Sequence, residues 1–119
     1  TFTQRAAIAA LDGPQDAVQS MAAEFAGRRR LITDGLRGIP GIRCPEPEGA
    51  FYAFPNISET GLTSRQFEDR AMQEAGVALL SGGGFGEFGE GYVRISYANS
   101  RENIQQALDQ LDTFVRSLV

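Results

Sequence analysis

The sequence predicts an α/β domain of two layers, in which helices pack on a small mixed sheet. Two kinds of segment carry this prediction. Apolar residues recur at three- and four-residue spacing in some segments, as in amphipathic helices, and other segments are short apolar runs bounded by Gly and Pro, as in strands. Their order is helix, long helix, strand, strand, helix, strand, strand, helix. The 119 residues, 42% of them hydrophobic, are enough for one domain with a core.

The first part of the chain is predicted to be helical. Residues 4–11 are rich in Ala, and the DGP turn at residues 12–14 ends this helix. A long connecting helix follows, and Gly38 and Pro40 stop it. Its apolar stripe consists of Val18, Met21, Ala22, Phe25, Ile32 and Leu36. The chain lacks an initial Met and begins in a helix-forming segment, so we expect it to be a piece of a longer protein.

The clearest strand signal lies in the middle of the chain. A short extended segment is expected at residues 41–44, followed by the aromatic run at residues 49–54 between Gly49 and Pro55. Because large residues stand at consecutive positions in this run, we expect a strand that is covered on both faces. Residues 56–62 are predicted to form a loop.

A short helix and a short strand are predicted next. Thr63 and Gln66 have the spacing of a capping box, which begins a helix that continues through Ala75 and ends at Gly76. The residues expected to face inward are Phe67, Ala71, Met72 and Ala75. Residues 77–80 are a short apolar run, and they predict a strand that leads into a glycine-rich loop at residues 81–91.

The last two elements have the most regular patterns. Residues 92–97 alternate, so Val93, Ile95 and Tyr97 should face one side of the sheet while Tyr92, Arg94 and Ser96 face the other. Asn99 or Ser100 is expected to cap the final helix. Its amphipathic stripe consists of Ile104, Ala107, Leu108, Leu111, Val115 and Leu118.

Composition excludes several kinds of chemistry. All 11 basic residues are Arg, and the sequence contains neither Lys nor His. Nucleophile schemes that need His, and a Schiff base on a side-chain amine, are therefore impossible within this chain. The net charge of −4 disfavours nucleic acid and membrane surfaces as partners. Cys44 is the only cysteine, so we expect neither a disulfide nor a multi-cysteine zinc site, and a cytoplasmic location fits best.

Charged clusters offer little direct chemical signal. The RRR triplet at residues 28–30 is interpreted as a solvated face, or as long stems lying over a neighbour, in preference to an anion site. The acidic residues have no spacing that indicates acid/base pairing, and solvated surface is the expectation for all of them.

The glycine-rich loop and Arg94 are the two features that stand out. Residues 84–89 spell the pattern G-x-G-x-x-G, but a strand follows the pattern where a nucleotide-binding motif needs a helix, so we interpret these glycines as shaping a loop at the rim of a cleft. Arg94 places a permanently charged fork in the middle of a strand. Spacing alone leaves two alternatives open. Arg94 could be structural, either in an ion pair or exposed to solvent, or it could bind the carboxylate of a ligand.

The sequence resembles the C-terminal part of class I and II aminotransferases, the pyridoxal-phosphate (PLP) enzymes of fold type I related to aspartate aminotransferase. The resemblance is carried by GAFYAFP at residues 49–55, by GFG and GEG at 84–86 and 89–91, and by YVRISYANS at 92–100. The opening QRAAIAALDGP at residues 4–14 also resembles the helix that follows the catalytic-lysine segment in that family. The resemblance extends over essentially the whole chain.

This resemblance implies a role for the chain. Residues 1–14 would be the end of a large-domain segment and residues 15–119 the small domain, with Arg94 in the place of the arginine that binds the substrate α-carboxylate. The absent large domain would bind PLP and carry the catalytic lysine, so the chain alone would be inactive. The expected partners are an amino acid or 2-oxo acid, the large domain of the same polypeptide and a second copy in a homodimer.

Two other interpretations remain open at this stage. The chain could be a stand-alone binding or regulatory module, or the small domain of a PLP-dependent lyase. The amino donor is not predicted by the sequence.

Overall fold

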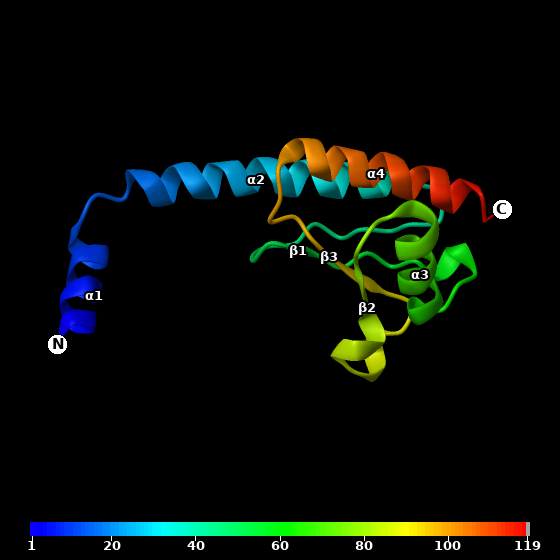
Figure 1. Cartoon of the computed structure of the whole chain (residues 1–119), viewed down its shortest axis with the longest axis horizontal. Coiled ribbons are helices and arrows are strands. Elements are labelled where there is room, and N and C mark those ends of the chain that lie inside the picture. The colour runs from blue at the N-terminus through cyan, green and yellow to red at the C-terminus, as the bar shows by residue number, and fades with distance from the viewer. Residues whose placement is uncertain (119) are drawn as a thin grey trace.

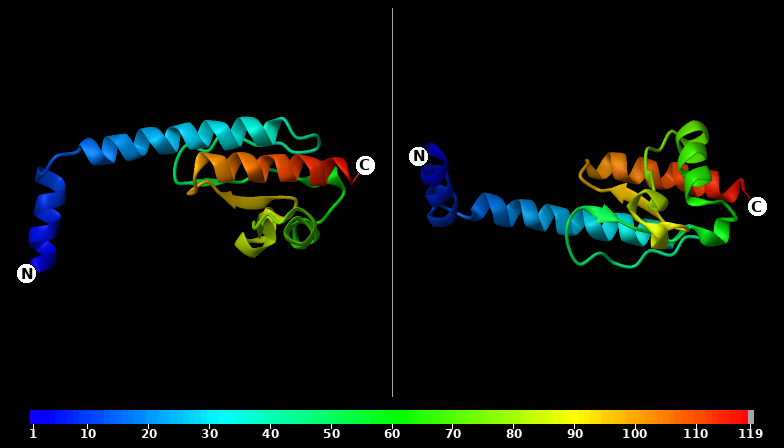
Figure 2. Two further views of the ribbon diagram at one scale, coloured as in Figure 1. Left: turned by 45° about the horizontal axis from the view of Figure 1, so that its top comes forward. Right: turned by 90° about the horizontal axis from the view of Figure 1, so that it is seen from below.

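The computed structural model describes residues 1–118, and it contains four α-helices and a three-stranded sheet. Helices α2 and α4 lie side by side and form one layer, and the sheet forms the other (Figures 1 and 2). Helix α3 lies beside strand β2 at the end of the sheet near the C-terminus (Figure 1). The elements are α1 (Phe2–Asp12), α2 (Asp16–Arg37), β1 (Tyr52–Ala53), α3 (Ser64–Arg70), β2 (Leu80–Ser81), β3 (Val93–Ser96) and α4 (Arg101–Arg116).

The sheet is antiparallel throughout the described residues, so the predicted mixed sheet was wrong. Its order is β1-β3-β2, and Ala53 pairs with Ile95 while Ser81 pairs with Val93. Strands β1 and β2 run in the same direction, as expected for strands joined by a helical crossover, but β3 lies between them. Each ladder therefore joins strands of opposite direction.

The aromatic strand is shorter and more open than predicted. Only Tyr52 and Ala53 form the ladder, because Ala50 adopts a left-handed backbone with φ of 58° and ends the extended run. The side-chain hydroxyl of Tyr97 donates a hydrogen bond to the Ala50 carbonyl over 3.0 Å and ties this turn to the end of β3. Ala53 is buried, but Phe51 is exposed and Tyr52 half-buried, so one face of the strand remains open.

The core lies between β3 and the two long helices, as the alternation of β3 predicted. Val93, Ile95 and Tyr97 are buried on the helix side, while Ser96 on the other side is exposed. The helices contribute Ile32 and Leu36 from α2 and Ile104, Leu108, Leu111 and Val115 from α4. Each such side chain contributes about 1.5–3 kcal/mol by leaving water, so this seam is the main stabilising contact of the fold.

The first part of the long helix does not pack as its stripe predicted. Val18 and Met21 are both 56% exposed, and α1 contains no buried residue. Figure 1 shows the reason: α1 and the start of α2 project beyond the sheet, where nothing in the described chain opposes them. The stripe meets the core only from Phe25 onward.

Local signals correctly predicted where α3 and α4 begin and that the helical segment after Thr63 ends at Gly76, which has a left-handed backbone with φ of 68°, but they did not predict its last turn. The Thr63 hydroxyl accepts a hydrogen bond from the Gln66 amide, and Ser100 caps α4 through the Asn103 amide. Helix α3 widens into a π-turn at Ala71–Ala75, closed by a bond from the Val77 amide to the Ala71 carbonyl. The wider turn rotates the side chains of Ala71–Ala75 relative to a regular α-helix. Met72 is therefore 55% exposed, although the sequence predicted that it faces inward.

No helix among residues 1–118 has the length and apolarity that crossing a membrane requires.

An ion-pair cluster links the two long helices on their solvent side. Glu24 of α2 accepts hydrogen bonds from Arg101 of α4 at 2.7 and 3.0 Å and from Arg28 at 2.9 Å. The hydrogen bonds from Arg101 and then Arg28 lower the pKa of Glu24 from 4.5 to about 2. The carboxylate therefore stabilises the folded chain only while it is ionised.

We expect this contribution to disappear in acid. Because the folded pKa lies below the unfolded one, the contribution of Glu24 is full above pH 4.5 and is lost as the pH falls toward 2. Thermal unfolding should show a lower Tm for Glu24→Gln than for the wild type at pH 6 and no difference near pH 2. Glu48→Gln is the matched control, since Glu48 is exposed and makes no ion pair in residues 1–118. A Tm difference for Glu24→Gln that persists unchanged at pH 2 would contradict this assignment.

Candidate functional site

Arg94 lies on the open face of the sheet, opposite the helix layer. Its guanidinium carbon is 4.3 Å from the ring centroid of Tyr52 and 4.3 Å from that of Phe85. Tyr52 belongs to the neighbouring strand β1, and Phe85 comes from the glycine-rich loop. Within residues 1–118, no carboxylate lies within 4 Å of this guanidinium and no acceptor forms a hydrogen bond with it. Its N–H groups therefore remain available to a ligand.

Aromatic side chains extend this face. Phe54 and Tyr92 stack with centroids 5.4 Å apart and an interplanar angle of 7°, and Phe85 meets Phe54 edge-on at 6.2 Å. Such pairs contribute about 0.5–1.5 kcal/mol beyond the area they bury. The charged group of Arg94 thus stands in an apolar aromatic setting, where water screens it less than on an open surface.

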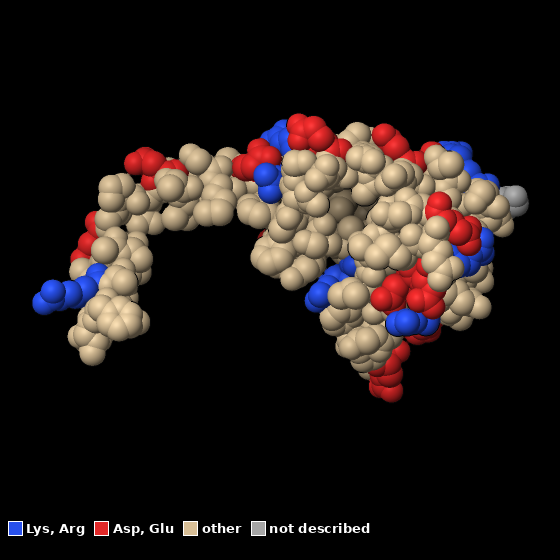
Figure 3. Space-filling model, in the orientation of Figure 1, with Lys and Arg blue, Asp and Glu red and all other residues tan. Residues whose placement is uncertain are grey.

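Most of the other arginines have partners, in contrast to Arg94. Arg43, Arg65, Arg70 and Arg116 pair with Asp or Glu side chains. Figure 3 shows basic and acidic side chains next to one another along the helix layer. In the basic triplet, Arg28 pairs with Glu24, Arg29 lies 3.4 Å from Glu46, and Arg30 is exposed. The triplet is therefore a solvated and ion-paired face, as the sequence indicated.

The glycine-rich loop folds into two short 3-10 turns, Gly82–Phe85 and Glu87–Gly89, and then enters β3. Gly82 and Gly89 cross at close range, so a Cβ on either residue would collide with the backbone of the other. A strand follows the G-x-G-x-x-G pattern, as predicted, and no helix N-terminus is present at that point to receive a phosphate.

Helix α3 holds the base of this loop at both ends. The Ser81 amide donates to Glu68 over 3.2 Å, the Gly91 amide donates to the Ser64 hydroxyl over 2.7 Å, and the Ser64 amide donates to Glu90 over 2.9 Å. Glu68 and Glu90 are thus structural acceptors, and the prediction that every acidic residue is merely solvated surface was wrong for them. The tip of the loop, with Phe85, remains exposed between these anchors.

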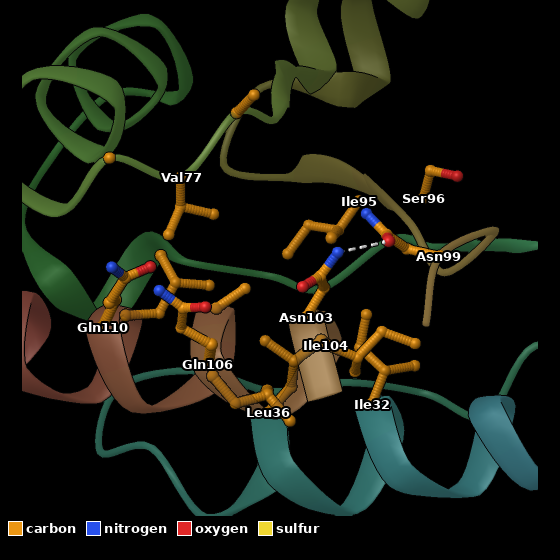
Figure 4. A pocket seen from close by; sticks show the side chains of 15 residues that line it. Ile32, Leu36, Val77, Ile95, Ser96, Asn99, Asn103, Ile104, Gln106 and Gln110 are labelled. Atoms are coloured by element: carbon orange, nitrogen blue, oxygen red, sulfur yellow. Dashed lines mark hydrogen bonds between the residues drawn. The ribbon is translucent and has the colours of Figure 1, made fainter. Parts of the chain in front are cut away.

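A cavity of about 330 Å³ lies elsewhere, between α4, α2, β3 and residues 76–78 (Figure 4). Apolar side chains form its floor, and the side-chain amides of Asn and Gln residues line its rim. Among these, Asn103 donates a 2.9 Å hydrogen bond to Asn99. Among the described residues, no ionisable side chain lines the cavity. It therefore offers no charged anchor and no titratable group, and we place the candidate site at Arg94.

Comparisons with known proteins show the family to which the chain belongs. The model of the family described as aminotransferase class I and II matches residues 1–111. The chain belongs to this family. It is 43% identical to an aspartate aminotransferase of Pyrococcus horikoshii over 94% of the chain, and 41% identical to an aromatic-amino-acid aminotransferase of Thermococcus litoralis over 98% of the chain.

Solved structures of aminotransferases have the same fold. An alanine aminotransferase from Pyrococcus furiosus superposes with a TM-score of 0.89 at 36% identity, and it covers 94% of this chain. An aspartate aminotransferase from Rhizobium meliloti gives a TM-score of 0.88 at 32% identity and covers 95% of this chain. This chain spans 29–30% of the length of these two structures and of the two relatives named above.

The chain's own residues do not fit the covalent anchoring of PLP. The sequence contains no Lys, so it offers no side-chain amine for a Schiff base. Within residues 1–118 no group of three His, Cys, Asp or Glu side chains is arranged to hold a metal ion. Cys44 is buried, and burial raises the pKa of its thiol, so it is not an activated nucleophile.

Phe85 is the residue of the candidate site around Arg94 that sequence reasoning missed. It lies in the glycine-rich loop, whose glycines predict a tightly turning backbone but not where the loop's side chains point. Its ring reaches Arg94 only because the loop folds back over β3. Tyr52 had a weak signal, since it lies in the aromatic run, but its register opposite β3 could not be read from the sequence.

The crossing of Gly82 and Gly89 gives a test of the loop's construction. We expect Gly82→Ala to lower the free energy of unfolding by about 1–3 kcal/mol, because the added Cβ meets backbone that cannot move aside. Gly84→Ala is the matched control in the same turn, where a Cβ meets open space, and it should change the unfolding free energy by less than about 0.5 kcal/mol. Urea unfolding monitored by circular dichroism measures both, and equal effects would contradict the crossing.

Proposed function

We propose that this chain is the C-terminal small-domain part of a PLP-dependent aminotransferase that transfers an amino group between an amino acid and a 2-oxo acid. In this proposal residues 1–14 end the large-domain segment and residues 15–119 form the small domain. The proposal rests on the position of Arg94 in a chain of this family. Its guanidinium lies on the open face of the sheet and has no acidic partner in residues 1–118. The names of the aspartate, aromatic and alanine aminotransferases that it resembles support the same reaction class.

The chemistry of Arg94 suits the α-carboxylate of the substrate. An amino acid and the 2-oxo acid derived from it share this carboxylate, so one anchor serves both directions of the transfer. Guanidinium presents two parallel N–H donors to the two carboxylate oxygens and stays protonated over the working pH range. A bidentate contact of this kind fixes the orientation of the α-carbon, and such positioning lowers the entropic part of the barrier.

The cofactor belongs elsewhere in this proposal. PLP, when bound, supplies the electron sink for the reaction. Because this chain has no lysine to anchor it, we assign its binding to the large domain of the same polypeptide, and we expect the chain alone to be inactive. A homodimer and a cytoplasmic location are part of the same proposal, and both rest on the family resemblance.

Replacement of Arg94 tests the assigned role. In the intact polypeptide that carries this chain, Arg94→Ala should lower kcat/KM for the amino donor by roughly 10- to 100-fold, the range expected for losing hydrogen bonds between charged groups. Arg94→Lys keeps the charge but loses the fork, so its activity should be intermediate. Arg30→Ala is the matched control, because Arg30 is exposed on the opposite layer. An unchanged kcat/KM in Arg94→Ala would contradict the proposal.

The assay also separates the other interpretations. Transfer of the amino group from donor to 2-oxo acid identifies an aminotransferase, whereas loss of the donor without transfer identifies a lyase. An intact polypeptide with a mass near 12.9 kDa would instead indicate a stand-alone binding module, because a chain without lysine has no amine for the cofactor.

Exposed apolar residues on the first two helices support a contact with the large domain of this proposal. Phe2 is 87% exposed and Leu11 81% exposed on α1, and Ile8 follows at 59%. Exposed apolar side chains that gather on one part of a surface usually mark a contact with another protein or domain. We assign α1 and the start of α2 to that contact.

The isolated chain should therefore associate with itself and bind an apolar fluorescent dye. Replacing Phe2 and Leu11 together by Gln should weaken both properties, because it removes the most exposed apolar groups of α1. Met72→Gln is the matched control, since Met72 is 55% exposed but lies away from α1. Sedimentation and dye fluorescence measure the effect, and a wild-type chain that is monomeric and binds no dye would contradict the assignment.

A further inference from the structure

The Arg94 guanidinium is held in an unusual way for this protein. Two aromatic rings contact it, each with its centroid 4.3 Å from the guanidinium carbon. Each of these rings contacts a further ring, Tyr52 meeting Phe51 and Phe85 meeting Phe54, but no ring contact joins Tyr52 to Phe85 in residues 1–118. The guanidinium carbon therefore lies over two rings that do not contact each other in residues 1–118.

This arrangement leaves the donors of Arg94 unused. A guanidinium attracts an aromatic ring through the face of its plane, whereas its N–H groups point outward along the edge. Arg101 is held differently in the same chain, by a carboxylate. Glu24 accepts hydrogen bonds from its Nε and Nη2, so these donors are not available to a ligand. Arg94 is thus oriented by contacts that do not compete with a carboxylate.

Phe85 also connects this contact to the glycine-rich loop. Its side chain is 50% exposed, and its edge-on contact with Phe54 sets the position of the ring over the sheet. The loop that carries it is anchored at its base to α3 through Glu68 and Ser64. The position of the ring over Arg94 therefore depends on how this loop is folded.

We propose that Phe85 and Tyr52 are positioning residues, which hold the plane of the Arg94 guanidinium against their rings so that its N–H edge faces the substrate carboxylate. This inference rests on the proposed function, because it assigns the carboxylate to Arg94. It goes further in assigning a role in substrate binding to a side chain of the glycine-rich loop. Neither ring needs to contact the reacting atoms.

A binding measurement tests the inference without turnover. The intact polypeptide that carries this chain, loaded with PLP, is titrated in a calorimeter with 3-phenylpropanoate, which has a carboxylate but no amino group. The same titration with 3-phenylpropanamide reports on contacts that do not need the charge. The ratio of the two dissociation constants measures recognition of the carboxylate.

We expect the wild type to prefer the carboxylate and Arg94→Ala to lose this preference. Phe85→Leu, which keeps apolar bulk but removes the π face, should weaken carboxylate binding by roughly three- to tenfold and leave amide binding unchanged. Tyr52→Leu should act in the same direction. Phe85→Tyr restores a ring and should bind within about twofold of the wild type. Phe88→Leu is the matched control, since Phe88 is in the same loop, is 88% exposed and makes no ring contact in the described residues.

The other outcomes separate this inference from the proposed function. If Arg94→Ala loses the preference but Phe85→Leu binds like the wild type, the positioning role is overturned and the proposed function stands. Equal weakening of carboxylate and amide in Phe85→Leu would also overturn it, because the ring would then contact the ligand directly. A similar loss in Phe88→Leu would overturn the specific role of Phe85. If the preference survives in Arg94→Ala, or is absent in the wild type, both fail.

Discussion

Strand β3 is the constraint on which the rest of the structure depends. It is the central strand, and both ladders of the sheet use it. Its period of two places Val93, Ile95 and Tyr97 in the core against α2 and α4, and it places Arg94 on the opposite face. The same four to five residues therefore fix the hydrophobic seam and aim the guanidinium, so a slip of one residue in register would bury a charge and expose the core.

Arg94 lies on the sheet without an acidic partner in residues 1–118, although acidic residues outnumber basic ones in the chain. The chain has 15 acidic and 11 basic residues, and acidic partners are therefore in excess. They nevertheless gather on the helices and at the loop base, where Glu24 joins α2 to α4 and Glu68 accepts from the Ser81 amide. Surface ion pairs of this kind contribute little individually. Their absence around Arg94, within residues 1–118, matters more than their presence elsewhere.

The sequence predicted what depends on periodicity and local capping. The stripe of α4, the alternation of β3 and the capping box at Thr63 are properties of short segments, and each is present in the structure. It did not predict the antiparallel sheet or the outward position of Met72, because strand order and the π-turn depend on tertiary contacts. The exposure of Val18 and Met21 has a different cause. An apolar stripe predicts an apolar helix face, but it does not predict whether another element of the described chain packs against that face. The position of Arg94 on the open face followed from spacing, whereas the rings around it did not.

In the proposed function, the aromatic environment of Arg94 avoids competition between an internal carboxylate and the substrate. An internal carboxylate would hold the guanidinium firmly, but an incoming carboxylate would first have to displace it, and the two contacts are of similar strength. An aromatic ring contributes roughly 0.5–2 kcal/mol and occupies only the face of the guanidinium plane, so it orients the side chain without competing for its donors. The two rings that contact Arg94 come from different segments, one from the sheet and one from a loop that folds back over it. Tyr52 supplies the first, and the glycine crossing at Gly82 and Gly89 allows the loop to deliver Phe85 as the second.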